Sequence, residues 1–546
     1  MPNVSLDTKY FMKRIGSSIA LDKLSEQLYK MGFEVENADE KEIKIEVTAN
    51  RPDLLGAVGM ARALRYFMHK EENYLHSIKD GAPALTIAVD GSVKGYRPFI
   101  SGIVVKDIKL NDAAIADLFS FTDKLCDTFG RQRKKLAIGV HNLGAIKGDL
   151  VYTIAKDEKM LALREKSLMS YSSIMQKNEK GIKYAGTLDE RKGYPVLKDS
   201  EGTLALIPII NSERTKLTDS TRNLFVDITG TSEYLVGKAA DLLASIFMEL
   251  GGKVSKISVR YGTTSRKFPL MEHQEFMISL AKLESEIGVE IGFNNALSLA
   301  NKMGYGAAFV NNKVRFTVPE YRLDIINEQD IIEDIAIAYG YDYINPVTVP
   351  SVSPGRLEAK DAFFEKASVA LVGMGFSESM NSYLSSSSVN FTKMTRKHNA
   401  GEAVTIKDAK SANIEILRTS LLPSLLSDLS SSKHEKMPQR LFELDMAFYV
   451  KRKQPVESYH VAAVSIDSGS NFNYSKSVVC SLLSALGIKF EAKAGSDPSF
   501  INGRCAAVIV DGKSIGIFGE LHPEVLRNFG IEEPAVAFEI DLTGLY

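Results

Sequence analysis

An acidic cluster within YRLDIINEQDIIEDIAIAYGY, residues 321–341, has the residue types that bind a divalent cation. Asp330, Glu333 and Asp334 are spaced i, i+3 and i+4, which places them on one face of a predicted helix, and Asp324 precedes that helix. Carboxylates without His or Cys favour a hard cation such as Mg²⁺. Alternatively, these acids stabilise the start of the helix through its macrodipole, and the spacing alone favours this second interpretation.

Polar side chains also follow three predicted strands in the middle of the chain. The strands cover about 137–140, 203–210 and 224–228, and the candidate site residues at their ends are His141, Asn211, Ser212, Glu213, Thr229 and Thr231, with Asp227 nearby. Side chains at strand ends can bind a polar substrate or orient a water molecule, because the strands are rigid and the loops vary. Ordinary turn chemistry explains the same residues, and the spacing alone favours it.

Several other kinds of site are excluded. The sequence has no GxSxG nucleophile, no GxxxxGK[ST] phosphate loop and no HExxH zinc motif. Its three cysteines form no CxxC pair, so neither a zinc site nor a disulfide framework is expected. The basic run 131–135 is typical of a solvated helix end, and Asn-Arg-Pro-Asp at 50–53 is typical of a strand, a turn and a helix start.

Several domains must position these residues, because 546 residues at roughly 100–200 per domain predict three to five of them. We predict an α+β multidomain fold. The alternating strand over 42–48 and the helical spacing of Leu24, Leu28 and Met31 place a small α/β unit first. The predicted domains are 1–82, 83–264, 265–349 and 350–546, and the last combines an antiparallel sheet with flanking helices.

The composition limits the class of protein. Apolar residues make up 45% of the chain and the net charge is −1, which excludes general disorder. Because 67 Lys and Arg are balanced by 68 Asp and Glu, contact with nucleic acid is expected to be local or shared with a partner chain. We find neither a secretory signal nor an apolar run near the ~20 residues of a membrane span, so we expect no membrane and a cytoplasmic location.

Several long segments, taken in order, resemble the β chain of phenylalanyl-tRNA synthetase of the shorter archaeal and eukaryotic type. The N-terminal (B1) signature is KIEVTANRPDLLGAVGMARAL, and that of the editing (B3/4) domain is IPIINSERTKLTDSTRNLFVDITGT. The small B5 domain is matched by VPEYRLDIINEQDIIEDIAIAYGYDYI, and the C-terminal module by LRTSLLPSLL, RLFELDMAF and IGIFGELHPEVL.

The resemblance implies a division of labour between two kinds of chain. A partner α chain activates Phe with ATP and charges tRNA(Phe), and the family assembles as two α and two β chains. Asp324, Asp330, Glu333 and Asp334 take the positions that the family assigns to Mg²⁺.

The resemblance also implies that the B3/4 domain hydrolyses mischarged Tyr-tRNA(Phe). A pocket built for Phe rejects one added hydroxyl only about 10²-fold, so a second, hydrolytic site improves accuracy. By position in the motif, Asn211 or Glu213 would bind that hydroxyl. His141, Ser212, Thr229 or Thr231 would place the water molecule.

The C-terminal module resembles a class II synthetase core that lacks an active site. Arg440 and Glu443 are similar to the Arg-x-Glu strand of that class, but residues 516–522 lack the arginine that would bind ATP. Asn142 and Ser232 stand where the family usually has Asp. Two alternatives therefore stay open, a structural scaffold subunit that does not edit and a free-standing aminoacyl-tRNA deacylase.

Overall fold

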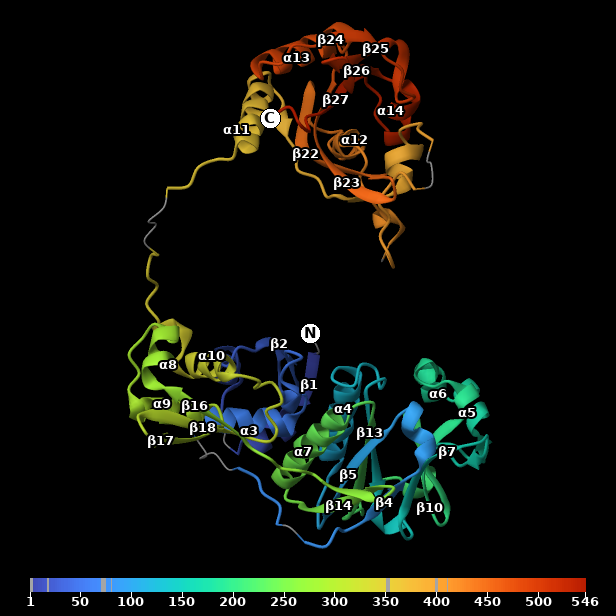
Figure 1. The fold of residues 1–546 in the computed structure, drawn as a ribbon, viewed down its shortest axis with the longest axis vertical. Helices are drawn as coiled ribbons and strands as arrows, with labels where there is room; N and C mark the ends of the chain where they lie inside the picture. The colour runs from blue at the N-terminus through green and yellow to red at the C-terminus, as the bar shows by residue number, and fades with distance from the viewer. Residues whose placement is uncertain are drawn as a thin grey trace. The chain divides into compact units, whose positions relative to one another are not determined.

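The computed structural model describes residues 3–16, 19–69, 75–79, 81–349, 354–397, 401–409 and 411–546. The chain divides into two compact units, Met1–Thr348 and Val349–Tyr546 (Figure 1). The first unit contains three successive domains, which we call the first, middle and small domains.

The first domain is a three-stranded antiparallel sheet with three helices. Its elements are β1 (Asn3–Asp7), α1 (Thr8–Ile15), α2 (Leu21–Lys30), β2 (Glu34–Ala38), β3 (Glu42–Glu46) and α3 (Ala57–Phe67), and the strand order is β1-β3-β2. Ile43 and Ile45 alternate inward on β3, and Leu24 and Leu28 are buried on α2, as the apolar spacing predicts. After α2, Gly32 has φ 88°, a left-handed conformation that suits glycine at a helix end.

The middle domain is built on a ten-stranded mixed sheet, with β15 attached to β14 at its side. Along the sheet the order is β12-β11-β10-β7-β4-β14-β5-β13-β6, and β4 is parallel to both of its neighbours. The strands are β4 (Thr86–Val89), β5 (Phe99–Lys106), β6 (Leu136–Asn142), β7 (Leu150–Ala155), β10 (Tyr194–Asp199), β11 (Gly202–Leu206), β12 (Ile210–Asn211), β13 (Leu224–Gly230), β14 (Lys253–Tyr261) and β15 (Thr264–Phe268). A separate two-stranded sheet pairs β8 (Lys159–Met160) with β9 (Met169–Ser170).

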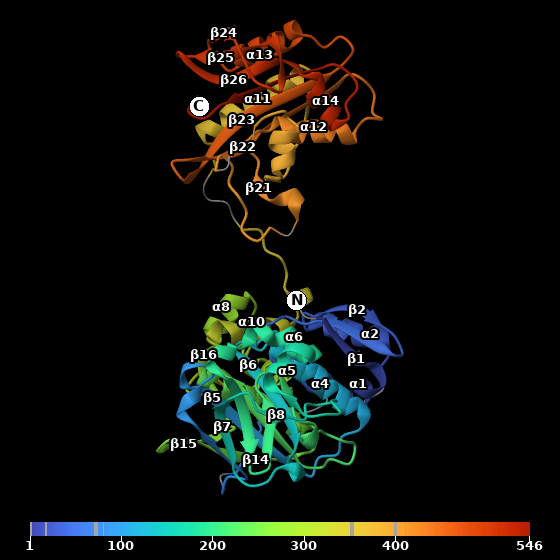
Figure 2. The same cartoon turned by 90° about the vertical axis from the view of Figure 1, so that its right-hand side faces the viewer.

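Helices cover this sheet. They are α4 (Asp112–Asp127), α5 (Tyr171–Lys177), α6 (Glu179–Tyr184) and α7 (Glu233–Glu249). Helix α7 packs against β5, β13 and β14, and α4 packs against β6 (Figures 1 and 2).

The two ends of the long sheet meet. Strand β12 contacts β6, and Asn211 Nδ2 donates a hydrogen bond to Val140 O over 3.2 Å. The sheet therefore curls until its first and last strands lie side by side, and polar residues from distant parts of the chain gather along this seam.

The small domain places three helices against a three-stranded antiparallel sheet of order β16-β18-β17. Its elements are β16 (Gln274–Ser279), α8 (Leu280–Ile287), α9 (Phe293–Lys302), β17 (Gly306–Val310), β18 (Lys313–Val318) and α10 (Glu328–Tyr339). Helix α10 begins after Asn327, whose side chain accepts the Gln329 N–H over 2.7 Å.

The C-terminal unit is a seven-stranded sheet of order β19-β22-β23-β27-β26-β25-β24, antiparallel except for β19 beside β22. One core forms with α12 and α14 and another with α11 and α13 (Figure 2). The larger elements are α11 (Ala359–Gly373), β19 (Ser377–Glu378), α12 (Leu422–Ser431), β22 (Gln439–Lys451), β23 (Gln454–Ile466), α13 (Phe472–Ala485), β24 (Glu491–Ala494), β25 (Phe500–Val510), β26 (Lys513–Leu521), α14 (Pro523–Phe529) and β27 (Ala535–Asp541). Strands β20 (Leu384–Ser385) and β21 (Ile416–Leu417) pair separately. In the part of the chain that the structure describes, no helix is both long and apolar enough to cross a membrane.

Candidate functional site

A small, partly open hollow lies along the seam of the middle domain. Strands β6 and β13, the segment 205–211 and the turn before β6 form its walls. Most of the lining residues are apolar in type, but the surface that they present to the hollow is more polar than apolar. The polar side chains are Arg133, Asn211, Asp227 and Thr229.

Gly139 gives the Asp227 carboxylate its room in this hollow. The two residues are partners in the antiparallel pairing of β13 with β6. A Cβ atom at position 139 would come within 2.1 Å of Asp227 Oδ2 and 3.1 Å of Asn211 Oδ1. The missing side chain therefore lets the Asp227 carboxylate lie directly against the backbone of β6.

A hydrogen-bonded chain holds Asp227 from behind. His141 Nε2 lies 2.9 Å from Asp227 Oδ2, and His141 Nδ1 lies 2.7 Å from Thr215 Oγ1. In the neutral tautomer that suits both partners, Nε2 donates to the carboxylate and Nδ1 accepts from the hydroxyl. His141 also stacks on Phe225, with a ring separation of 5.9 Å. These contacts fix the orientation of the Asp227 carboxylate.

Two buried arginines brace the same region. Arg133 donates to the carbonyl groups of Pro208 and Ile209 over 3.2 and 3.0 Å and so holds the apolar wall. Arg97 donates to Thr229 Oγ1 over 3.1 Å and to its carbonyl over 2.8 Å. The charge of Arg97 also interacts with that of the buried Asp227 carboxylate, while Arg133 pairs with Asp123 over 2.9 Å.

The structure brings together only part of the predicted set. Asn211 and Thr229 line the hollow, and His141 contacts it through Asp227. Ser212, Glu213 and Thr231 do not line it, which corrects the expectation for these three residues.

The physical reasons are local. Ser212 donates to Leu161 O over 3.2 Å and caps the short helix that follows. Glu213 pairs with Lys216 and accepts the Arg164 N–H over 2.8 Å; these bonds hold the pKa of Glu213 below its ordinary value. Thr231 lies beyond the end of β13, where its N–H donates to Lys135 O.

Sequence reasoning placed Asp227 in the polar cluster at the strand ends without naming it as a site residue, and treated Arg133 as part of a solvated run. The signal for Asp227 was its i, i+2 spacing from Thr229, because alternate residues of a strand share one face. Nothing in the basic run indicates that Arg133 is buried, since its acceptors lie 75 residues and more along the chain.

The hollow presents hydrogen-bonding groups and no thiol, since Cys126 is not among its lining residues. The Asp227 carboxylate and the Asn211 amide can hydrogen-bond a substrate hydroxyl or a water molecule.

The predicted Mg²⁺ residues do not converge. Arg322 donates to both oxygens of Asp324 over 2.9 and 2.8 Å and to Asp334 over 2.6 Å. Asp330 accepts two N–H groups at the start of its own helix, and Glu333 is exposed. Within the described residues, no group of three His, Cys, Asp or Glu side chains is arranged to hold a metal. The four carboxylates as placed here do not fit Mg²⁺, which requires near-octahedral oxygen ligands.

Comparisons with known proteins agree along the whole chain. The matching family models are the "Phe-tRNA synthetase beta subunit B1 domain" over residues 1–70, the "B3/4 domain" over 128–245, the "tRNA synthetase B5 domain" over 276–341 and the "Phenylalanyl tRNA synthetase beta chain CLM domain" over 346–542.

Full-length relatives agree with these models. A phenylalanine–tRNA ligase beta subunit from Archaeoglobus fulgidus is 34% identical over 100% of this chain and 99% of its own. One from Methanocaldococcus jannaschii is 33% identical over 99% of this chain and 100% of its own. The crystal structure of an N-terminal fragment of the Pyrococcus horikoshii phenylalanyl-tRNA synthetase beta subunit matches with a TM-score of 0.60 and 30% identity, over 62% of this chain and 100% of the fragment. The chain therefore belongs to the family of phenylalanine–tRNA ligase β subunits.

Proposed function

We propose that the seam hollow hydrolyses Tyr-tRNA(Phe) that a partner α chain has mischarged. The observation that carries this proposal is the pair of polar groups, Asp227 and Asn211, that lie close to Gly139 in a hollow whose lining residues include several aliphatic side chains. The apolar wall suits an aromatic ring, and the carboxylate accepts a hydrogen bond from the phenol hydroxyl. Phenylalanine offers no such hydroxyl and forms no hydrogen bond with the carboxylate, which disfavours its binding relative to tyrosine.

The reaction is the hydrolysis of an ester. A water molecule attacks the carbonyl carbon of the aminoacyl ester, and the bond to the ribose oxygen breaks. That oxygen takes a proton, so the products are tyrosine and tRNA with a free terminal hydroxyl. In this proposal two completely buried residues are positioning residues: His141 acts through Asp227, and Thr229 is held by Arg97.

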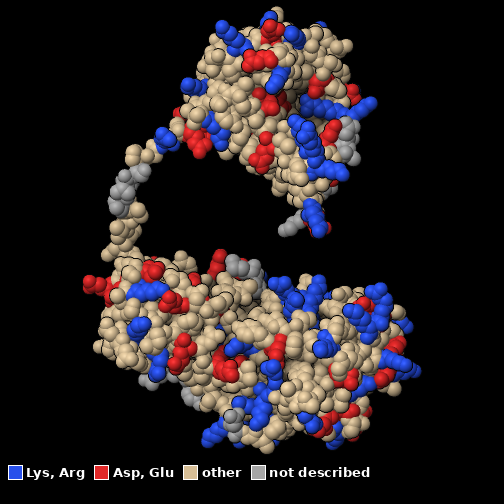
Figure 3. Space-filling view, viewed as in Figure 1, with Lys and Arg blue, Asp and Glu red and all other residues tan. Residues whose placement is uncertain are grey.

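Basic side chains of the middle domain support a contact with tRNA. Figure 3 shows Lys and Arg gathered over the part of this domain that contains α5 and α6. Lys177, Lys180 and Lys183 lie in these two helices, and Arg191 and Lys192 follow them. Such a local cluster binds phosphate groups even though the chain as a whole is near neutral.

For the C-terminal unit we propose a class II synthetase-like core that supports the α chain and lacks its own active site. Its antiparallel sheet flanked by helices supports this proposal. So does Glu443 of the Arg-x-Glu strand, which is buried against Arg418 instead of facing a ligand. Phe activation with ATP then belongs to the α chain, in a cytoplasmic assembly of two α and two β chains.

Two measurements separate this proposal from its alternatives. Native mass spectrometry of the complex recovered with this chain from its own cells should show a second chain in equal number. Tyr-tRNA(Phe) deacylation should then be measured with that complex and with Asp227→Asn, using Glu213→Gln outside the hollow as the control. Full activity of this chain alone would favour the free-standing deacylase, and no activity of the complex would favour the scaffold.

A further inference from the structure

The guanidinium of Arg322 occupies the centre of the acidic cluster that was expected to bind Mg²⁺. It forms a two-pronged pair with Asp324 and a further bond to Asp334, and only 1% of the Arg322 side chain is exposed. Tyr305 O–H also donates to Asp334. Burial raises the pKa of Asp324, but the opposing charge and hydrogen bonds of Arg322 outweigh this effect and keep it below its ordinary value. Both carboxylates are thus neutralised by a cation of the chain itself.

A second arginine reaches the cluster from another domain. Arg51, in the Asn-Arg-Pro-Asp turn of the first domain, donates to both oxygens of Asp53 over 2.9 Å. The charges of Arg322 and Asp324, in the small domain, interact with that of Arg51. This turn, which the sequence alone explains as a helix start, thus lies near the acidic cluster of the small domain.

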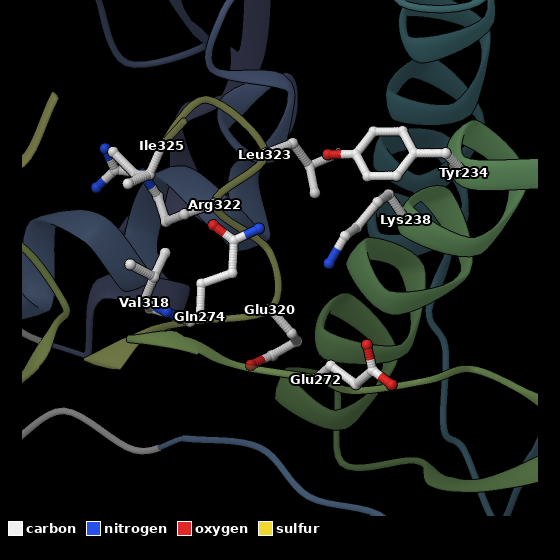
Figure 4. A pocket seen from close by; sticks show the side chains of 10 residues that line it. Tyr234, Lys238, Glu272, Gln274, Val318, Glu320, Arg322, Leu323 and Ile325 are labelled. Atoms are coloured by element: carbon white, nitrogen blue, oxygen red, sulfur yellow. The ribbon is translucent and has the colours of Figure 1, made fainter. Parts of the chain in front are cut away.

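Neighbouring contacts join the same two domains. The Arg62 guanidinium lies 3.4 Å from the centre of the Tyr321 ring, and Lys302 Nζ lies 4.3 Å from that of Phe67. Figure 4 shows the Arg322 side chain turned away from Lys238 and Glu272, which line a hollow on its other side. The segment around Arg322 is thus packed onto the first domain.

We propose that Arg322 is the cation of this cluster, and that its pairs with Asp324 and Asp334 hold the segment 319–326 without a metal ion. This segment packs on the first domain through Tyr321 and Arg62, so the arrangement locks the first domain to the small domain. A metal that used Asp324 and Asp334 would have to displace a buried guanidinium, which would then lack a partner. Asp330 serves its own helix as a cap, and Glu333 alone is a single exposed carboxylate. The family assigns these four positions to Mg²⁺. Here Arg322 and the start of the helix already use three of the carboxylates, which leaves one exposed carboxylate for a metal ion.

The unmodified complex provides the first test. It should be purified without chelator, divided, and one half dialysed against EDTA and then against metal-free buffer. We expect substoichiometric Mg²⁺ in both halves by plasma mass spectrometry and the same thermal midpoint. One Mg²⁺ per chain before dialysis, with a lower midpoint after its removal, would overturn the proposal.

Substitutions provide the second test. Arg322→Met leaves two buried carboxylates uncompensated, so the midpoint should fall by at least about 5 °C. Hydrogen exchange should accelerate both in 47–56 and in 319–326, because the lock joins these segments. Adding Asp324→Asn and Asp334→Asn to Arg322→Met should recover part of the loss.

The control is Glu333→Gln, which removes an exposed carboxylate of the family metal set. We expect it to change neither the midpoint nor the metal content. Loss of bound Mg²⁺ in Glu333→Gln, or an Arg322→Met protein as stable as the parent, would contradict the lock. If Arg322→Met does not fold, the chelation experiment on the unmodified complex still decides the question.

Discussion

His141 Nε2 lies 2.9 Å from Asp227 Oδ2, and the His141 side chain is completely buried. His141 therefore cannot touch a substrate or a water in the hollow, and its effect must pass through the carboxylate. This geometry changes the role expected from the motif, in which the histidine would place the water itself.

His141→Phe keeps a ring against Phe225 but removes both hydrogen bonds. We expect kcat for Tyr-tRNA(Phe) hydrolysis to fall roughly 10- to 100-fold, because the buried carboxylate loses a charge-assisted partner. His141→Gln retains a donor and should recover part of the rate. An equal loss in both variants, with unchanged thermal midpoints, would argue against the positioning role.

Gly139→Ala places a methyl group where the Asp227 carboxylate lies, so the carboxylate must move. The clash within 2.1 Å of Asp227 Oδ2 should abolish Tyr-tRNA(Phe) hydrolysis while charging with Phe continues. Gly144→Ala is the matched control, since its Cβ would meet only Asn142 Oδ1, at 3.3 Å. Normal hydrolysis by Gly139→Ala would place the reaction elsewhere.

Asp241 should make the first unit less stable at neutral pH than at acidic pH. Burial raises the pKa of Asp241 to about 6, above its value in the unfolded chain. The stability that the protonated Asp241 carboxyl contributes to the folded state is therefore fully present below about pH 4 and is lost as pH rises through 6. Asp241→Asn can still accept the Leu270 and Met271 N–H groups that the carboxylate accepts. The Asp241→Asn substitution should raise the free energy of unfolding by about 1–3 kcal/mol at pH 7.5 and leave it unchanged near pH 4.

Thermal unfolding at both pH values measures this effect. The exposed Asp149→Asn serves as the control, because its side chain is 67% exposed. A stabilisation that is the same at both pH values would show that proton binding to Asp241 is not its cause.

Glu539 should have the opposite effect in the C-terminal unit. Burial raises its pKa, but His460 and Ser420 outweigh this effect and lower it to about 2. Its stabilisation is therefore present above about pH 4.5 and is lost as pH falls toward 2. Glu539→Gln should cost about 3 kcal/mol at pH 7, seen as faster hydrogen exchange in β23 and β27. The exposed Glu491→Gln should leave this exchange unchanged.

Local patterns in the sequence predict the elements better than their assembly. The alternation of Ile43 and Ile45 predicts β3, and the acids after Asn327 predict the start of α10. Strands β16 and β17 carry weaker patterns, because their burial is mostly intermediate or exposed. Their positions depend on pairing with β18.

The candidate site depends on long-range geometry that periodicity does not contain. Only the curling of the sheet brings Asn211 to Val140, and only the β13–β6 register places Gly139 opposite Asp227. For the acidic cluster, helical spacing predicts a shared face, but the position of Arg322 decides which carboxylates are free. Arg322 lies two residues before Asp324, within the quoted motif, yet its contact with Asp334 requires the folded chain.

The central claim is that the seam hollow removes tyrosine from tRNA(Phe). Its most direct test is single-turnover deacylation of Tyr-tRNA(Phe) and Phe-tRNA(Phe) by the intact complex, with and without Asp227→Asn. The account predicts that the parent complex hydrolyses Tyr-tRNA(Phe) much faster than Phe-tRNA(Phe) and that Asp227→Asn removes most of this difference. Equal rates for the two substrates in the parent, or an unchanged preference in the variant, would contradict it.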